Sequence, residues 1–531
     1  MQVIQTLYKH YVRHAGVLLC AAVCGYWLFQ SFYYLPHDFS NSYFGGYFFL
    51  RGEFDTGIFD PYTFNKRIYD EGFREIYVSY NPNPPFSALF FAPLALLPLH
   101  AAKLAFNIVS CAWFFISIYR LCKFKQVEPG WIFLLLPVLF FTPFRNQILF
   151  GQTYFLLFAL LVEGYLAWEQ KSEWQSSLLW GLAIFLKVFP VIIFLFLLTR
   201  REWRATAKLA AVCLGLLAVS ISLQGIEVWK FYLTDVLPPN GRGEIGGAYV
   251  VNYQSVLMFF KYAFYGDPQL NPYPLVNSPV AYEVALLLLK SLLLGFCVHL
   301  IKRSGNLLSF GFLLLTAILL SPYGSTYTYI LLAILLVACY TDFRRYFIPM
   351  AVVIFLIANL PLSLFESLPP LWQFPRLALL LVLFGSVVVL ARIKLDWKIV
   401  ALFVTLFSIP AFNQLRMPKD ASTFLETRER FGLVFDYHVR DGWLVCKYWD
   451  TNGENTRRTD IQSNRLSQED IALKGNQVFF RNTQLTHTLD QKLKPAMLDD
   501  GRIIYLSDKF KGMGFYSLRV IDLGLLNNAN H

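Results

Sequence analysis

Long apolar runs alternate with short polar interruptions over most of this chain, from about residue 16 to residue 412. Many runs hold about 17 to 25 residues, enough for a helix to cross the roughly 30 Å hydrocarbon core of a bilayer. The pattern predicts an all-α polytopic membrane region with about 13 transmembrane helices. The predicted spans are residues 16–35, 84–99, 101–122, 131–145, 151–169, 176–199, 205–224, 281–301, 306–321, 325–341, 346–362, 373–391 and 397–412.

Two of these spans, 84–99 and 131–145, are short and rich in proline. Proline removes a backbone donor and crowds the preceding helical turn. Both places are therefore compatible with a broken or re-entrant helix.

Two longer polar stretches, residues 36–83 and 225–280, separate the apolar runs. The first interleaves aromatic and charged residues, which favours short helices lying in the headgroup zone of the membrane; an ordinary packed loop is the alternative. The second contains aromatic residues together with the flexible segment 238–243, as expected of a binding loop with a mobile part.

The composition changes near residue 413. Short runs rich in β-branched and aromatic residues follow one another up to residue 521, and turn signals such as Asp441-Gly442 and Asn452-Gly453 separate them. We therefore predict a polytopic domain at 1–412 and a small β-rich soluble domain at 413–531, with a structural or acceptor-contacting role for the latter. The predicted strands include 433–439, 443–449, 477–481, 503–507 and 516–521.

The overall composition agrees with a membrane protein, because 56% of the 531 residues are hydrophobic and only 15% are charged. The net charge is +11, and residues 414–531 hold 17 Lys and Arg against 15 Asp and Glu, a surplus of 2 that leaves +9 for the apolar region. Most of that charge sits in short loops, as orientation signals do, so we expect no nucleic-acid partner.

The short loops also predict the orientation. With a cytoplasmic N-terminus, the basic loops around 200–208, 302–303, 344–345 and 392–398 fall inside, and only Lys123 and Lys125 oppose the rule. Asp38, the 225–280 stretch and the C-terminal domain are then extracytoplasmic. The first apolar run has no small-residue cleavage site and is interpreted as a retained helix. No Asn-x-Ser/Thr sequon occurs, in line with a multi-pass protein of a bacterial inner membrane and the cell envelope.

Asp38 follows the first apolar run in the sequence His37-Asp38-Phe39. A carboxylate at the water-facing mouth of a helical bundle is suited to act as a general base. The alternative is a helix-capping or loop aspartate.

Lys187 lies near the middle of span 176–199, followed by Pro190. A lysine at the bilayer centre costs about 2.5 to 3.5 kcal/mol, so it normally faces a cavity or a partner. It is a candidate for binding a phosphate; a buried pair with Glu163 or Glu283 is the alternative.

Arg145 and Arg242 are further phosphate-binding candidates, because the guanidinium fork matches phosphate oxygens. Arg145 can also be a membrane-edge anchor.

Polar residues near the mouth of the helical bundle are candidates for binding a sugar or an acceptor, although those around residue 254 can instead cap a helix. This group comprises His37, Tyr80, Gln152, Asn252 and Gln254. No phosphate-binding loop, zinc motif or Asp-x-Asp pair occurs, so we expect neither a metal nor a cofactor.

Several motifs together resemble glycosyltransferase family 87. They are Asn83-Pro84-Pro85 with the FSALFFAPLALLP that follows, GQTYFLLFALL, GLAIFLKVFP, the basic RREWR, Asn252-Tyr253-Gln254-Ser255 and Leu320-Ser321-Pro322-Tyr323. They occur in the family's order, and the resemblance covers roughly residues 30 to 345. The chain departs from the family's pattern at Asn83, where an aromatic residue is usual, and after the Ser-Pro turn, where histidine is frequent.

The resemblance implies a polytopic enzyme of the GT-C fold that takes a sugar, typically mannose, from a polyprenyl-phosphate donor. It also implies a catalytic aspartate in the first outer loop, at a position matching Asp38. The hypothesis is therefore a membrane hexosyltransferase that inverts the anomeric carbon in a single displacement and passes the sugar to a lipid or glycan acceptor. The alternatives are a transporter or flippase of a lipid-linked substrate, which would favour internal repeats, and a non-catalytic scaffold.

Overall fold

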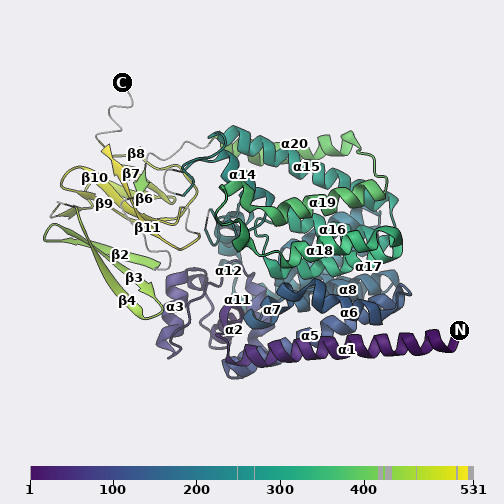
Figure 1. Cartoon of the computed structure of the whole chain (residues 1–531). Helices are drawn as coiled ribbons and strands as arrows, with labels where there is room; N and C mark the ends of the chain where they lie inside the picture. The colour runs from purple at the N-terminus through teal and green to yellow at the C-terminus, as the bar shows by residue number, and fades with distance from the viewer. Residues whose placement is uncertain are drawn as a thin grey trace. The chain divides into compact units, whose positions relative to one another are not determined.

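The computed structural model describes residues 2–247, 249–267, 270–416, 422–424, 433–461, 463, 465–509 and 512–523. It divides the chain into two compact units. The helical unit comprises Met1–Glu53, Asn83–Trp229 and Val251–Ile409, and the β unit comprises Phe54–Pro82, Lys230–Val250 and Pro410–His531. Figure 1 shows long helices in the first unit and strands in the second.

Every predicted span falls on helical structure. The helices of the helical unit are α1 (Gln2–Tyr33), α2 (His37–Leu50), α4 (Pro85–Phe91), α5 (Leu99–Phe124), α6 (Pro129–Leu139), α7 (Phe141–Phe150), α8 (Tyr154–Glu169), α9 (Glu173–Leu186), α10 (Ile193–Thr199), α11 (Trp203–Gln224), α14 (Val256–Phe264), α15 (Pro279–Arg303), α16 (Asn306–Leu320), α17 (Leu332–Asp342), α18 (Phe347–Asn359) and α19 (Pro375–Leu390). Helices α12 (Ile226–Phe231) and α20 (Trp397–Arg416) run across the unit boundaries.

Among the described residues, five helices are long and apolar enough to cross a membrane, or six if one bent pair forms a single span. The five stretches are His14–Tyr33, Leu99–Phe124, Trp203–Gln224, Pro279–Arg303 and Trp397–Leu415. A helical membrane region is therefore confirmed, while the larger number of 13 crossings stays a prediction.

The break expected within 131–145 is present. Helices α6 and α7 meet at 74°, and the residue between them, Phe140, leaves the helical region with φ −118° and ψ 32°. Pro143 lies in the first turn of α7, where a backbone N–H has no helical partner in any case. The span 84–99 is also interrupted, because α4 continues as a short 3-10 helix over Ala92–Leu96.

Helix α8 is largely apolar and is buried from Tyr154 to Trp168, so it belongs to the core of the helical unit. It packs between α5 and α9. Gly164 permits a close approach of α9, since a Cβ there would lie 2.5 Å from the ring of Trp180. The Trp180 ring donates a hydrogen bond to the Leu161 carbonyl at 3.2 Å and so joins the two helices.

The described strands of the β unit form antiparallel sheets. One has the order β1-β11-β10-β9-β5, and the others are β2-β3-β4 and β6-β7-β8. The strands are β1 (Thr423–Phe424), β2 (Leu433–Arg440), β3 (Trp443–Asp450), β4 (Gly453–Asp460), β5 (Leu466–Ser467), β6 (Ile471–Lys474), β7 (Gln477–Phe480), β8 (Thr483–Gln484), β9 (Lys492–Leu498), β10 (Arg502–Ser507) and β11 (Ser517–Asp522). The predicted β-rich C-terminal region is confirmed, as is the turn at Asp441-Gly442, where φ is +52° and +80° as in the tight turns that favour Asp-Gly.

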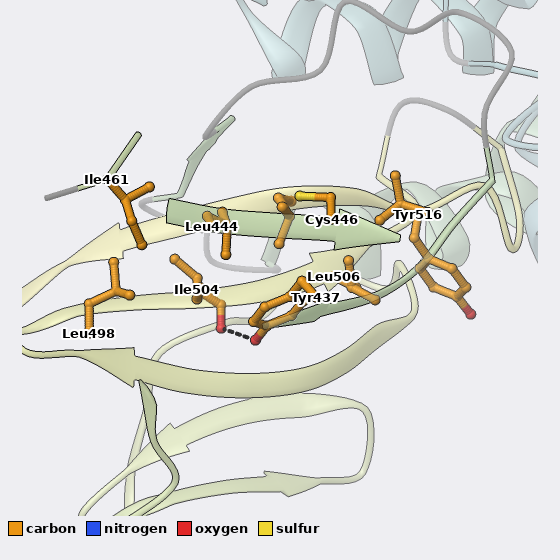
Figure 2. Packing of buried hydrophobic residues seen from close by; sticks show 10 residues of the cluster. Tyr437, Leu444, Cys446, Ile461, Leu498, Ile504, Leu506 and Tyr516 are labelled. Atoms are coloured by element: carbon orange, nitrogen blue, oxygen red, sulfur yellow. Dashed lines mark hydrogen bonds between the residues drawn. The ribbon is translucent and has the colours of Figure 1, made fainter. Parts of the chain in front are cut away.

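The core of the β unit lies between two of its sheets (Figure 2). Tyr437 and Leu444 come from β2 and β3, and Leu498 and Ile504 come from β9 and β10. The Tyr437 hydroxyl donates a hydrogen bond to the Ile504 carbonyl at 3.1 Å, so the buried phenol is satisfied across the interface.

The second half of the first polar stretch belongs to this β unit. Its helix α3 (Pro61–Asp70) lays Tyr62 on Phe435, with ring centroids 4.1 Å apart, and sets Tyr69 edge-on to Trp449 at 5.2 Å. The packed-loop alternative therefore describes residues 54–82. In the second stretch, part of the segment expected to be mobile forms the short helix α13 (Leu237–Gly241).

Candidate active site

Asp38 and Gln152 are 114 positions apart in sequence and meet in the helical unit. Asp38 lies in the first turn of α2, where a carboxylate is favoured by the helix dipole, and the N-cap is Pro36, so Asp38 is not the capping residue. The Gln152 amide Nε2 donates a hydrogen bond to Asp38 Oδ2. Asp38 is exposed while Gln152 is 7% exposed, so a buried amide holds an accessible carboxylate.

The turn that presents Gln152 is fixed by its neighbours. Gly151 ends α7 in the left-handed conformation with φ +67°, and a Cβ there would lie 2.6 Å from the Cβ of Phe39. The Gln152 N–H donates to the Gln147 carbonyl at 2.9 Å, and the Gln147 side-chain amide donates back to the Gln152 carbonyl. Only glycine allows this turn to sit directly against the residue that follows Asp38.

Lys187 stands at a break in its helix. Helix α9 ends at Leu186, Lys187 is extended with φ −148° and ψ 119°, and a 3-10 helix follows over Phe189–Ile192. The α-helix is thus interrupted just before Pro190. The Lys187 Nζ donates a hydrogen bond of 3.1 Å to Asn83 Oδ1, a neutral acceptor.

The carboxylates considered as alternative partners of Lys187 are engaged elsewhere. Glu163 forms an ion pair with Arg120 at 2.5 Å and accepts a hydrogen bond from Ser117 at 2.9 Å. Glu283 interacts electrostatically with Lys290, two turns along the same helix. The structure thus favours a role for Lys187 other than a structural ion pair with either carboxylate.

The charge of Asp38 acts on three groups from other segments, Lys187, Tyr253 and Tyr327. The ring of Tyr327 lies 5.3 Å from that of Tyr154, and the ring of Tyr253 lies 5.1 Å from that of Tyr323. Tyrosine offers both an apolar face and a hydroxyl, the combination that binds a sugar ring and its hydroxyl groups. The site thus places a carboxylate, an ammonium and tyrosines within electrostatic reach of one another.

The polar segment before α14 is largely structural. The Gln254 amide donates to the carbonyls of Val251 and Gln373, each at 2.8 Å, and its oxygen accepts the Arg376 N–H at 3.2 Å. Ser255 caps α14, so the capping alternative holds for that residue. Asn252 is exposed. Gln254 therefore fixes the backbone that carries Tyr253.

The remaining predicted site residues are Arg145, Arg242, Tyr80 and His37. Arg145 is exposed and lies 5.8 Å over the Trp27 ring, as the anchor alternative expects. Arg242 and Tyr80 belong to the β unit: Arg242 makes a two-pronged ion pair with Glu244 at 2.9 and 2.7 Å, and Tyr80 is wholly buried among aromatic rings. His37 begins α2, and its side chain lies outside what the structure describes.

Sequence reasoning missed several members of this site. Asn83 was noted only as a departure from the family's pattern, yet it is the acceptor for Lys187. Gln147, Tyr253 and Tyr327 were not candidates at all. A polar residue inside an otherwise apolar helix is the signal that could have identified Gln147. For the two tyrosines the signal was the family motifs, since Tyr253 lies within Asn252–Ser255 and Tyr327 follows the Ser-Pro turn.

Comparison with known proteins agrees with the motifs. A segment of 168 residues is 29% identical to the polyprenol-phosphate-mannose-dependent alpha-(1-2)-phosphatidylinositol pentamannoside mannosyltransferase of Mycobacterium tuberculosis (strain CDC 1551 / Oshkosh), covering 30% of this chain and 37% of the relative. A segment of 161 residues is 29% identical to the polyprenol-phosphate-mannose-dependent alpha-(1-2)-phosphatidylinositol mannoside mannosyltransferase of Mycolicibacterium smegmatis, covering 27% of this chain and 35% of the relative. The chain thus matches little more than a third of the length of these relatives.

Residues 81–322 match the model of glycosyltransferase family 87. This range contains Asn83, Gln152, Lys187 and Tyr253, while Asp38 precedes it. The resemblance that the motifs predicted is therefore confirmed: from residue 81 to residue 322 this chain carries the sequence pattern of glycosyltransferase family 87.

Proposed function

We propose that this protein is an integral membrane hexosyltransferase that moves mannose from a polyprenyl-phosphate donor to a lipid or glycan acceptor. The observation that carries the proposal is the hydrogen bond from Gln152 to Asp38, with Lys187 within electrostatic reach of that carboxylate. The match to glycosyltransferase family 87 and the names of the two mannosyltransferase relatives support the class of donor and the sugar.

The proposed reaction is a single displacement. The Asp38 carboxylate takes the proton of an acceptor hydroxyl as its oxygen attacks the anomeric carbon of the donor sugar. The bond between that carbon and the phosphate oxygen breaks, and polyprenyl phosphate leaves with the bonding electrons. The new glycosidic bond forms on the opposite face, so the anomeric configuration inverts and no covalent enzyme intermediate is needed.

Gln152 serves in this scheme to orient the base. Its buried amide donates to one carboxylate oxygen of Asp38, and the turn formed with Gly151 and Gln147 fixes that amide in turn. A carboxylate held at a set angle needs less reorganisation when it receives the acceptor proton, which lowers the barrier.

Lys187 serves to stabilise the departing phosphate. Its ammonium is held by the neutral Asn83 oxygen, so its positive charge is retained for an anionic ligand. Arg242 already pairs with Glu244, and Arg145 lies over Trp27. Lys187 is therefore the first of the three basic candidates to test.

The proposed location is a bacterial inner membrane, with a cytoplasmic N-terminus and the reaction on the extracytoplasmic face. The support is the run of basic residues in alternate short loops, which orients helices in membranes. The donor then reaches the site from the outer leaflet, with its polyprenyl tail among membrane lipids.

The test is transfer of radiolabelled mannose by the purified full chain in lipid nanodiscs. Polyprenyl-phosphate-mannose is supplied with a membrane lipid extract, and matched reactions receive polyprenyl-phosphate-glucose or a nucleotide-linked mannose. Labelled product is expected only from polyprenyl-phosphate-mannose, with inverted anomeric configuration by NMR. Failure of folded protein to use any polyprenyl-phosphate sugar would contradict the proposal, and retention of configuration would contradict the single displacement.

A further inference from the structure

Lys103 of α5 is a buried lysine that the proposed reaction does not use. It is 1% exposed. Its Nζ donates to the carbonyls of Ser31, Tyr34 and Leu35 at 3.2, 3.4 and 3.2 Å, and lies 5.7 Å over the Tyr34 ring. A buried charge held by carbonyl oxygens and a ring is costly in a membrane protein and is usually retained for a function.

The carbonyls that Lys103 binds belong to the end of α1 and the residues just after it. The last carbonyls of a helix lack helical partners and carry the negative end of its dipole, so a cation there is favourable. The chain then reaches Asp38 three residues after Leu35. Lys103 thus fixes the stretch of backbone that leads into Asp38.

Asn107 stands one turn further along α5, on the same side of the helix as Lys103. Its Nδ2 donates to Ser31 Oγ at 3.0 Å and to the Ile148 carbonyl at 2.8 Å. The Ser31 hydroxyl also donates to the Ile148 carbonyl, at 2.9 Å. Ile148 belongs to α7, four residues before Gln152. Asn107 therefore ties the end of α1 to the last turn of α7.

Gly151 also lies against Lys103. A Cβ added there would lie 3.4 Å from the Cγ of Lys103, as well as against Phe39. The two segments that carry Asp38 and Gln152 thus rest on one face of α5. The hydrogen bond between Asp38 and Gln152 forms where these two segments come together.

We propose that Lys103 and Asn107 are positioning residues that set the separation of Asp38 and Gln152. They do not touch the reacting atoms; they act by holding the end of α1 and the end of α7 in a fixed relation. The inference rests on the proposed function for its kinetic consequence, while the separation itself can be measured without any turnover. A misplacement of about 1 Å in a catalytic group can cost about 10²-fold in rate.

The kinetic experiment replaces the cation by an uncharged chain of similar length, Lys103→Met, in the full chain in nanodiscs. We expect kcat to fall about 10- to 100-fold, while KM for the polyprenyl-phosphate donor changes less than about twofold. Lys103→Arg keeps a cation near the carbonyls and should restore part of the loss. Asn107→Leu supplies a second variant if Lys103→Met does not fold.

A double variant separates positioning from simple destabilisation. In the Asp38→Asn background, Lys103→Met should change the residual rate less than about twofold, because the positioned carboxylate is already absent. A purely structural role would lower the amount of folded enzyme by the same factor in both backgrounds. Ser117→Ala is the matched control: it removes another buried polar contact of α5, to Glu163, 14 residues from Lys103, and should leave kcat per folded enzyme unchanged.

The second readout requires no activity. In the pair Asp38→Cys with Gln152→Cys, a short thiol crosslinker should join the two positions, and the crosslinked peptide is measured by mass spectrometry. Adding Lys103→Met should lower the yield severalfold. Unchanged yield and unchanged kcat would overturn the inference and leave the proposed function standing. Wild-type protein that transfers no sugar while Lys103→Met still lowers the yield would overturn the proposed function and leave the positioning role standing.

Discussion

Each unit of this protein contains a lysine and an aspartate that act on each other, and the two pairs are held differently. In the β unit, Lys492 is 0% exposed, lies 3.3 Å from Asp490 and also donates to the carbonyls of Thr488 and Asp490. In the helical unit, the amide of Asn83 binds Lys187, and the amide of Gln152 binds Asp38. Asp38 is exposed, whereas Asp490 is almost wholly buried.

The difference distinguishes a structural ion pair from a site. Two opposite charges in direct contact and out of water satisfy each other, and removing one is costly because the other is left buried. Charges held by neutral amides keep most of their electrostatic interaction for a ligand that is not yet bound. We therefore propose a chemical role for Asp38 and Lys187, and a structural role for Asp490 and Lys492.

The strongest way to test this comparison is Lys187→Met. The substitution removes the charge that we propose stabilises the departing phosphate, so transfer should fall about 10²- to 10³-fold, as loss of one oxyanion-stabilising donor does. The measurement is kcat with polyprenyl-phosphate-mannose. Lys290→Met is the control, because Lys290 also lies in an apolar helix but acts on Glu283. An equal loss of kcat in both variants would contradict a specific role of Lys187 in stabilising the departing phosphate.

A second test acts on the turn rather than on a charge. Gly151→Ala places a side chain at φ +67° and against Phe39, so Gln152 must move away from Asp38. We expect a loss of roughly 1–3 kcal/mol of stability and a drop in transfer of about tenfold. The matched control is Gly215→Ala in α11, where an added Cβ meets no atom within 4 Å. Gly215→Ala should keep transfer intact and stabilise its helix slightly.

A third test concerns pH in the β unit and should leave the chemistry untouched. Burial, followed by the charges of Asp490 and Glu244, raises the pKa of Asp508 to about 8, although N–H groups of Gly514 and Gln491 donate to its carboxyl group. Because the folded pKa lies above the unfolded value of 3.8, the contribution of Asp508 to folding is complete below pH 3.8 and is lost as the pH rises towards 8.

Hydrogen exchange of β10 and β11, corrected for the intrinsic exchange rate, should therefore show protection that declines between pH 5 and pH 8. Asp508→Asn can accept only one of the two N–H donors, so its protection should be lower but should depend less on pH. A decline of the same steepness in Asp508→Asn would assign the pH dependence to another group.

Much of the fold follows directly from sequence pattern, because apolar run length and strand alternation are local signals. The predicted strands near 433–439, 443–449 and 503–507 match β2, β3 and β10 closely. Strand β4 was missed because its Arg457 and Arg458 made the run too polar. The assignment of residues 54–82 to the β unit was missed for another reason: it depends on contacts such as Tyr62 on Phe435, which join segments more than 370 residues apart.

The residues that the structure brings together in the candidate site were predicted in part. Asp38, Gln152 and Lys187 were identified as polar exceptions beside or within apolar runs, a signal that the cost of burying polar groups in a membrane explains. Their mutual arrangement depends on where the start of α2, the end of α7 and the end of α9 lie. No local sequence pattern specifies these positions. Gln254 and Arg242 were also candidates, yet the structure engages Gln254 with backbone groups and Arg242 with Glu244.

The most direct measurement compares one aspartate from each unit. Transfer of labelled mannose from polyprenyl-phosphate-mannose is measured for the wild type, Asp38→Asn and Asp490→Asn, each normalised to folded protein, together with thermal unfolding. We predict that Asp38→Asn unfolds at the wild-type temperature and loses about 10²- to 10⁴-fold in transfer. Asp490→Asn should lose about 3–5 kcal/mol of stability, because the buried Lys492 loses its counter-charge, and keep its transfer per folded molecule. Wild-type transfer by folded Asp38→Asn would contradict the account.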